Sequence, residues 1–212
     1  MTKRSLPSRF GFYSVLTDPL KGYEYLTELL VDNEMPFVQL RMKNVPEKTV
    51  IDTAIRMRKI TENSNTLLII NDSPGIAKEV GADGVHIGQD DMPYEEVRAI
   101  VGNDAIIGIS THSKAQTENA CRFTPDYIGI GPVYATPTKV IADPVIGLDG
   151  MKEQLAASTV PAVCIGGIDL SNLADVLEAG AQNFCMVRQF AQSENPGRVL
   201  KEAMRIYSRY YK

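Results

Sequence analysis

The chain has 212 residues, of which 44% are hydrophobic and 23% are charged, and its formal net charge is −4. This composition is typical of a globular protein long enough to bury one sizeable core, so we expect a single domain over residues 1–212. The basic excess that favours binding to nucleic acid or to an anionic membrane surface is absent, so we expect small-molecule partners, with no nucleic acid and no membrane.

Short apolar runs recur along the chain at fairly even spacing. Each is four to six residues long and rich in Val, Ile, Leu and aromatic residues, a composition typical of β-strands. The predicted strands are residues 11–16, 37–40, 67–71, 84–87, 105–110, 127–131, 162–167 and 184–187.

Amphipathic segments between these runs predict helices. Residues 47–61 carry an apolar stripe among Lys, Arg and Asp, and residues 94–101 form a second such segment. In residues 171–180, Ser171 is a candidate N-cap and Gly180 a candidate helix end. Residues 195–211 predict a closing helix.

Alternating strands and helices indicate βαβ units and a parallel sheet. Eight strands with helices between them favour a (β/α)₈ TIM barrel. The alternative is an open doubly wound sheet, which favours a G-x-G-x-x-G turn after the first strand; "LTDPLKG" does not match that pattern.

Polar residues follow the predicted strands, where the active groups of a barrel gather. Arg41, Lys43 and Lys139 are cations, whereas Asp72, Asp90 and Asp91 are anions. Cations and carboxylates in one barrel mouth indicate a polyphosphate bound with Mg²⁺ as the cofactor. The alternative is that these charges lie in solvent and pair with one another. The diglycine Gly166–Gly167 indicates a second phosphate site.

The histidines and cysteines predict little chemistry of their own. His86 lies within a predicted strand and is expected to be a packed, hydrogen-bonded residue, and His112 receives no role. Cys121, Cys164 and Cys185 form no CxxC pair, so we expect them to be reduced and mostly buried. No signal peptide and no membrane span is predicted, so we expect a cytoplasmic protein; a homo-oligomer stays open.

Several long motifs, in order, resemble the thiamine phosphate synthase family. They are "YSVLTDP", "VQLRMKN", "IINDSPGIAKEVGADGVHIGQDDMP", "IIGISTHS", "DYIGIGPVYATPTK" and "VCIGGI", and together they extend over nearly the whole chain. The resemblance implies a transferase with a TIM barrel that joins a hydroxymethylpyrimidine diphosphate to a hydroxyethylthiazole phosphate. It also implies that pyrophosphate leaves first and that the thiazole nitrogen captures the resulting cation.

The resemblance implies roles for individual residues. Those for the pyrimidine diphosphate are Gln39, Arg41, Lys43, Asn71, Ser110 and Lys139, of which Lys139, Ser110 and Arg41 are the catalytic candidates. Those for the thiazole phosphate are Thr136, Thr138, Gly167, Val187 and Arg188. Asp72 and Asp91 match the Mg²⁺ ligands.

One position departs from the family pattern. The family usually has a small hydroxyl residue where this chain has Arg188, so the arginine either adds a phosphate contact or crowds the site. Two other functions stay open: a thiazole tautomerase with the same barrel, and a barrel that binds thiazole phosphate or thiamine phosphate without catalysis. Retained Asp72, Asp91, Ser110 and Lys139 argue against the tautomerase.

Overall fold

A computed structural model describes residues 6–136 and 143–211 as a closed barrel of eight parallel strands. The strands are β1 (Gly11–Leu16), β2 (Phe37–Leu40), β3 (Leu67–Asn71), β4 (Gly84–Ile87), β5 (Ile106–Thr111), β6 (Tyr127–Ile130), β7 (Ala162–Cys164) and β8 (Asn183–Phe184). Strand β1 pairs with β8 through Gly11–Asn183 and Phe12–Phe184, which closes the ring. The predicted TIM barrel is confirmed.

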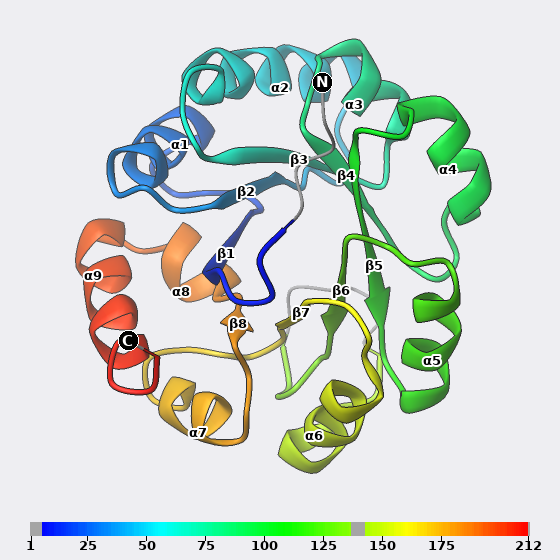
Figure 1. Ribbon diagram of the computed structural model, residues 1–212. Coiled ribbons are helices and arrows are strands. Elements are labelled where there is room, and N and C mark those ends of the chain that lie inside the picture. The colour runs from blue at the N-terminus through cyan, green and yellow to red at the C-terminus, as the bar shows by residue number, and fades with distance from the viewer. Residues whose placement is uncertain (1–5, 137–142, 212) are drawn as a thin grey trace.

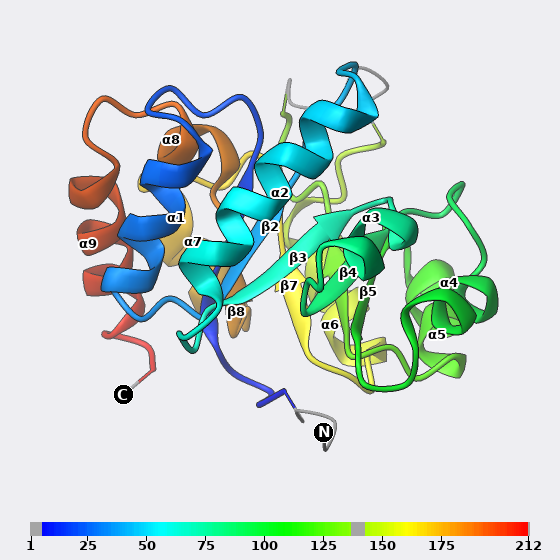
Figure 2. The same cartoon turned by 90° about the horizontal axis from the view of Figure 1, so that it is seen from above.

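The helices surround the strands (Figure 1). They are α1 (Tyr23–Asp32), α2 (Glu47–Thr61), α3 (Pro74–Glu79), α4 (Tyr94–Val101), α5 (Lys114–Arg122), α6 (Gly147–Ala157), α7 (Leu173–Glu178), α8 (Val187–Ala191) and α9 (Pro196–Tyr207). Figure 2 shows α1, α8 and α9 on one side of the barrel and α3, α4 and α5 on the opposite side. Helices α2 and α4 begin and end where the sequence predicted.

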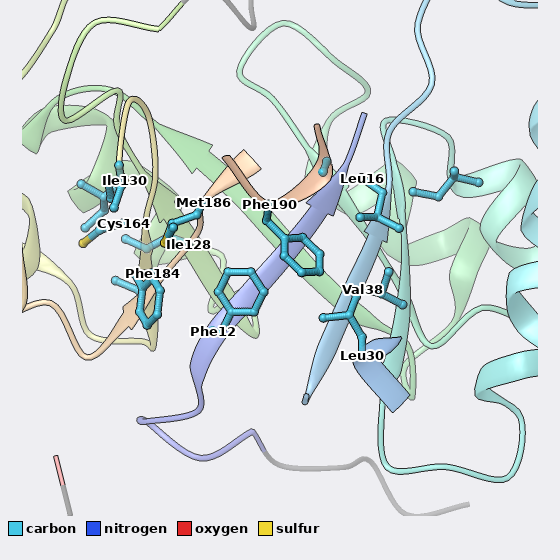
Figure 3. Packing of buried hydrophobic residues seen from close by; sticks show 14 of the residues in the cluster. Phe12, Leu16, Leu30, Val38, Ile128, Ile130, Cys164, Phe184, Met186 and Phe190 are labelled. Atoms are coloured by element: carbon cyan, nitrogen blue, oxygen red, sulfur yellow. The ribbon is translucent and has the colours of Figure 1, made fainter. Parts of the chain in front are cut away.

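Strand alternation divides the apolar residues into two cores. Phe12, Leu16 and Val38 belong to the large core between the strands and the helices, where Phe12 packs against Phe184 and Phe190 (Figure 3). The alternate positions form a smaller core inside the barrel, which consists of Tyr13, Val15, Phe37, Leu67, Ile69, Ile106, Tyr127, Val163 and Cys185. The inner core supports the site above it.

The last two strands are shorter than predicted. Strand β7 ends at Cys164, before the diglycine, because Gly166 and Gly167 adopt φ values of +101° and +62° that a strand does not use. Strand β8 ends at Phe184, and Val187 is already the first residue of α8. Strands β5 and β6 differ from the prediction by one residue at their ends.

The start of α7 corrects a predicted cap. Asn172, not Ser171, occupies the N-cap position, and its side chain makes no capping hydrogen bond. The Ser171 hydroxyl donates instead to Asp169 Oδ1 at 2.5 Å. Gly180 lies just past the helix with φ +104°, as expected of a glycine that ends a helix.

The three cysteines are free thiols. Burial raises the pKa of the Cys164 and Cys185 thiols to about 12, so neither is a thiolate at neutral pH. Cys121 is only partly buried. All three cysteines are therefore free of disulfides, as predicted, and two of the three are buried.

Candidate active site

A cavity of about 640 Å³ opens at the carboxyl ends of the strands. Eight residues predicted from the sequence line it: Gln39, Arg41, Asn71, Ser110, Thr136, Gly167, Val187 and Arg188. They come from segments between 39 and 188 in the chain, and the closed barrel brings them together because the same ends of parallel strands meet at one face. Thr138 and Lys139 fall outside the described residues.

The cavity floor is a hydrogen-bonded group of polar side chains from five strands. Gln39 Nε2 donates to the Tyr13 hydroxyl at 2.9 Å, and that hydroxyl lies 2.6 Å from the Tyr127 hydroxyl. His86 lies between Tyr127, 2.9 Å from its Nδ1, and Ser110, 2.8 Å from its Nε2. Burial raises the pKa of both tyrosines, so the two hydroxyls are neutral.

Arg41 is held at the cavity wall by the loop that follows β1. Its backbone N–H donates to Leu16 O at 3.0 Å, and its backbone oxygen accepts from the Thr17 hydroxyl at 2.8 Å. Its guanidinium Nη1 donates to the same hydroxyl at 3.2 Å. The remaining guanidinium donors can therefore bind an anionic ligand in the cavity.

Lys43, Asp72 and Asp91 do not line the cavity but gather beyond the ends of β2, β3 and β4. Lys43 forms an ion pair with Asp72, and Asp91 Oδ2 accepts from Gly88 N at 2.7 Å. Although Asp91 as a residue is exposed, partial burial of its carboxyl raises its pKa; the Gly88 N–H lowers that pKa, and nearby Asp72 raises it again. Two neighbouring carboxylates therefore compete for positive charge here.

The donor set at Asp72 and Asp91 fits Mg²⁺ better than a transition metal. Carboxylate oxygens are hard ligands, and Mg²⁺ is usually bound by one or two carboxylates together with phosphate oxygens and water. Over residues 6–136 and 143–211, no group of three or more His, Cys, Asp or Glu side chains forms a protein-only metal site. A cation at this carboxylate pair would thus need ligands from a bound phosphate.

The diglycine loop lines the cavity on the side opposite β3, and both glycines are required by close packing. A Cβ on Gly166 would lie 2.4 Å from Pro132 Cα, and a Cβ on Gly167 would lie 2.7 Å from Ala135 O. Asn172 Nδ2 donates to Gly167 O at 2.9 Å and holds the loop in place. This loop and the start of α8 correspond to the segments where barrels often bind phosphate.

Sequence reasoning gave no site role to four residues that line the cavity, Tyr13, Tyr127, His86 and His112. The prediction of a hydrogen-bonded His86 is confirmed, but the residue also faces the cavity. His112 Nδ1 donates to Gly131 O at 2.6 Å, and its Nε2 lies 3.4 Å from Asp143. His112 lies one residue beyond the end of β5, whereas the other three rings lie within strands. For those three, the available signal was a polar ring inside an apolar run.

The family model and two relatives that match this chain all belong to one family. The family model described as thiamine monophosphate synthase matches residues 15–190. The thiamine-phosphate synthase of Caldicellulosiruptor saccharolyticus is 38% identical over 177 residues, which are 84% of this chain and 80% of that protein. That of Gloeobacter violaceus is 44% identical over 164 residues, 77% of this chain but only 48% of the longer relative.

A solved structure is similar over almost the whole length. The thiamine phosphate pyrophosphorylase of Pyrococcus furiosus superposes with a TM-score of 0.86 at 27% identity, covering 96% of this chain and 98% of the other. The corresponding protein of Bacteroides thetaiotaomicron, at 15% identity and a TM-score of 0.68, shares the fold. Among the described helices, none is both long enough and apolar enough to span a bilayer.

Proposed function

Because this chain is a transferase of the thiamine monophosphate synthase family, we propose that it joins 4-amino-5-hydroxymethyl-2-methylpyrimidine diphosphate to 4-methyl-5-(2-hydroxyethyl)thiazole phosphate. The products are thiamine phosphate and pyrophosphate. The observation that carries the proposal is a single cavity with Arg41 on one side and the diglycine loop on the other, beside a carboxylate pair. A cavity with anion-binding groups on both sides can hold two phosphorylated substrates at once.

The reaction breaks one bond and forms one bond. The carbon–oxygen bond of the pyrimidine methylene group breaks, and its electron pair leaves with pyrophosphate. The thiazole nitrogen then donates its lone pair to the methylene carbon and forms the new carbon–nitrogen bond. No proton is transferred in either step, so no general base is required, and the site needs only to stabilise the departing charge and align the partners.

The residues divide between the two substrates. Arg41, Lys43 and Lys139 neutralise the diphosphate, while Gln39, Asn71 and Ser110 hold the pyrimidine ring. Bound Mg²⁺, held by Asp72 and Asp91, would supply further positive charge to the leaving group.

The thiazole phosphate belongs at the opposite wall of the cavity. Thr136 and Thr138 offer hydroxyl donors, and Gly167, Val187 and Arg188 offer backbone N–H groups. Gly167 and Val187 line the cavity wall, and the Arg188 side chain is exposed there, so its guanidinium can reach an anion without crossing the floor. This arrangement keeps the two phosphates apart and brings the reacting atoms together between them.

The decisive experiment measures pyrophosphate release. The protein with Mg²⁺ and both substrates should release pyrophosphate and form thiamine phosphate, and omission of the thiazole should prevent thiamine phosphate formation. A thiazole tautomerase would act on its thiazole substrate alone and would not respond to Mg²⁺. A protein that binds thiamine phosphate without releasing pyrophosphate from the substrate pair would contradict the proposal.

A further inference from the structure

Hydrogen bonds on the cavity floor link five polar side chains in a chain across the barrel, and Gln39 also interacts with Tyr127. The chain runs from Gln39 through Tyr13, Tyr127 and His86 to Ser110, with successive donor–acceptor distances of 2.9, 2.6, 2.9 and 2.8 Å. Gln39, Tyr13 and Tyr127 are each at most 3% exposed, and they line the cavity. Hydroxyl protons that are buried to this extent are usually donated to an acceptor, and here the nearest acceptors are the neighbouring side chains of the chain.

The orientation of the Gln39 amide, with Nε2 toward Tyr13, sets the direction of the chain. Gln39 Nε2 is only a donor, so the Tyr13 oxygen accepts from it and the Tyr13 proton is free to point onward. The Tyr13 proton then goes to the Tyr127 oxygen, and the Tyr127 proton goes to His86 Nδ1. A neutral His86 that accepts at Nδ1 carries its proton on Nε2, and it donates that proton to Ser110 Oγ.

The opposite direction leaves a buried proton without an acceptor. If His86 Nδ1 donated to Tyr127, the Tyr127 proton would go to Tyr13, whose oxygen already accepts from Gln39. The Tyr13 proton would then have no acceptor among the hydrogen bonds of the described residues. Leaving a buried donor unsatisfied is costly, so the forward direction is strongly favoured.

We propose that Tyr13 and Tyr127 are positioning residues that fix His86 as the Nε2–H tautomer and thereby orient the Ser110 hydroxyl as a donor into the cavity. Because Ser110 Oγ accepts from His86, the serine proton is available to an acceptor atom of the substrate. The substrate group recognised is therefore a hydrogen-bond acceptor, such as an unprotonated ring nitrogen, and not an N–H donor. The identity of that ligand rests on the proposed function, whereas the tautomer does not.

Glycines shape the space in which this chain forms. A Cβ on Gly108 would lie 2.2 Å from Tyr127 Cζ and 2.6 Å from His86 Nδ1, so only glycine lets these two side chains meet. A Cβ on Gly129 would lie 3.4 Å from His86 Cε1. Residues of three neighbouring strands, β4, β5 and β6, thus pack around the imidazole of His86.

The tautomer can be read directly by NMR of ¹⁵N,¹³C-histidine-labelled protein without a histidine tag. The chain has only two histidines, so a His112→Asn variant assigns both signals. His112 serves as a reference for a protonated Nδ1, because donation to the Gly131 carbonyl requires a proton there, whether or not its Nε2 beside Asp143 is protonated too. At about pH 8.5, where an ordinary imidazole is neutral, His86 should give the Nε2–H pattern. An Nδ1–H pattern, or a persistent imidazolium, would overturn the proposal.

Tyr127→Phe tests the positioning role with little change of volume. Nδ1 of His86 loses its donor, so the His86 signals should shift from one tautomer to a mixture. The KM for the pyrimidine diphosphate should rise about tenfold, on the scale of one hydrogen bond, while the KM for the thiazole phosphate stays unchanged. The matched control is Tyr210→Phe on the exposed surface, which should alter neither quantity.

The NMR measurement and the KM measurement distinguish the ways in which the proposal could fail. A single His86 tautomer that persists in Tyr127→Phe would overturn the role of the tyrosine chain, and an unchanged KM would overturn the role of Ser110 as donor. If no variant, nor the unmodified protein, released pyrophosphate, the proposed function would fail, yet the NMR result would still decide the tautomer.

Discussion

Asp90 and Asp91 are adjacent in the chain but differ in environment. The Asp91 carboxylate turns back onto Gly88 N and lies close to Asp72, whereas no such contact is found for Asp90 within the described residues. Two carboxylates that are adjacent in the sequence can therefore have different roles. At the scale of single residues, the direction of the side chain decides which carboxylate can share a cation with Asp72.

The first prediction concerns the metal requirement. Asp91→Asn and Asp72→Asn should each raise the Mg²⁺ concentration needed for half-maximal rate, because Mg²⁺ coordination depends on ligand charge. Asp90→Asn, the matched control, should change that concentration little. Titration of Mg²⁺ against the initial rate of pyrophosphate release measures all three. If Asp90→Asn were the most damaging, the assignment would be wrong.

The second prediction concerns stability without metal. Burial and the neighbouring Asp72 raise the pKa of Asp91, so this carboxyl favours folding only while protonated, and that contribution is lost as pH rises through the raised pKa. At pH 7 with EDTA, Asp91→Asn should therefore slightly raise the melting temperature, the effect being limited by solvent screening. Asp90→Asn should leave it unchanged. A lower melting temperature for Asp91→Asn would contradict repulsion at this pair.

The third prediction concerns Arg188, at the position where the resemblance to the family implies a small hydroxyl residue. Because Arg188 is exposed and lines the cavity, Arg188→Ser should raise the KM for the thiazole phosphate several-fold and leave that for the diphosphate nearly unchanged. Steady-state kinetics with each substrate varied in turn provides the test. If both constants improve, the arginine obstructs the site.

At the scale of an element, the loop between β7 and α7 combines backbone conformation with close packing. Gly166 has φ +101° and lies against Pro132, and Gly180, at the end of α7, has a similar φ of +104° but no atom within 4 Å of the point that a Cβ would occupy. Both glycines have a positive φ, but only Gly166 is closely packed, so an added methyl group causes backbone strain at both positions and a steric clash at Gly166 alone. Comparison of their alanine variants isolates the contribution of packing at the site.

The fourth prediction follows from this comparison. Gly166→Ala should destabilise the protein more than Gly180→Ala, since only the former places Cβ 2.4 Å from Pro132 Cα. Gly166→Ala should also raise the KM for the thiazole phosphate, which Gly180→Ala should not. Urea unfolding and kinetics of both variants measure these effects. Equal loss of stability would show that the loop relaxes around the added methyl group.

At the scale of the whole molecule, polar side chains that are buried or partly buried join neighbouring strands at the opposite end of the barrel. Asp83 and Asp126 accept from the backbone N–H groups of Leu68 and Ile107, each at 2.9 Å, and each also pairs with an arginine. Asn183 joins the last strand to the first, because its Oδ1 accepts from Phe10 N and Gly11 N. Its Nδ2 donates to Ser8 O and Ala162 O.

The fifth prediction tests the hydrogen bonds by which Asn183 joins β8 to β1. Asn183→Ala should lower the free energy of unfolding by about 3 kcal/mol, because backbone groups in two buried and two partly buried hydrogen bonds lose their partner. The control is Asn33→Ala, whose amide donates to Leu29 O at the surface and whose loss should cost little. Urea denaturation with an unchanged m-value is the measurement. A small effect at Asn183 would mean that the remaining β1–β8 pairs suffice.

Local pattern and spacing were enough to predict the barrel, the bounds of α2 and α4, and eight of the residues that line the cavity. These features depend on neighbours in the chain: apolar alternation marks a strand, and a polar residue at its end marks the mouth. The diglycine was also identified, although only its φ values show why β7 stops before it.

The tertiary structure alone decided the chain from Gln39 to Ser110, the contacts that distinguish Asp91 from Asp90, and the shortness of β8. Tyr13 and Tyr127 are separated by 114 residues, and their hydroxyls meet only because the closed ring points alternate residues of both strands inward. In sequence each is one aromatic residue in an apolar run, which is equally typical of packing in a core. Such contacts depend on how the strands are staggered around the ring, and that stagger is set by the packing of all eight strands together.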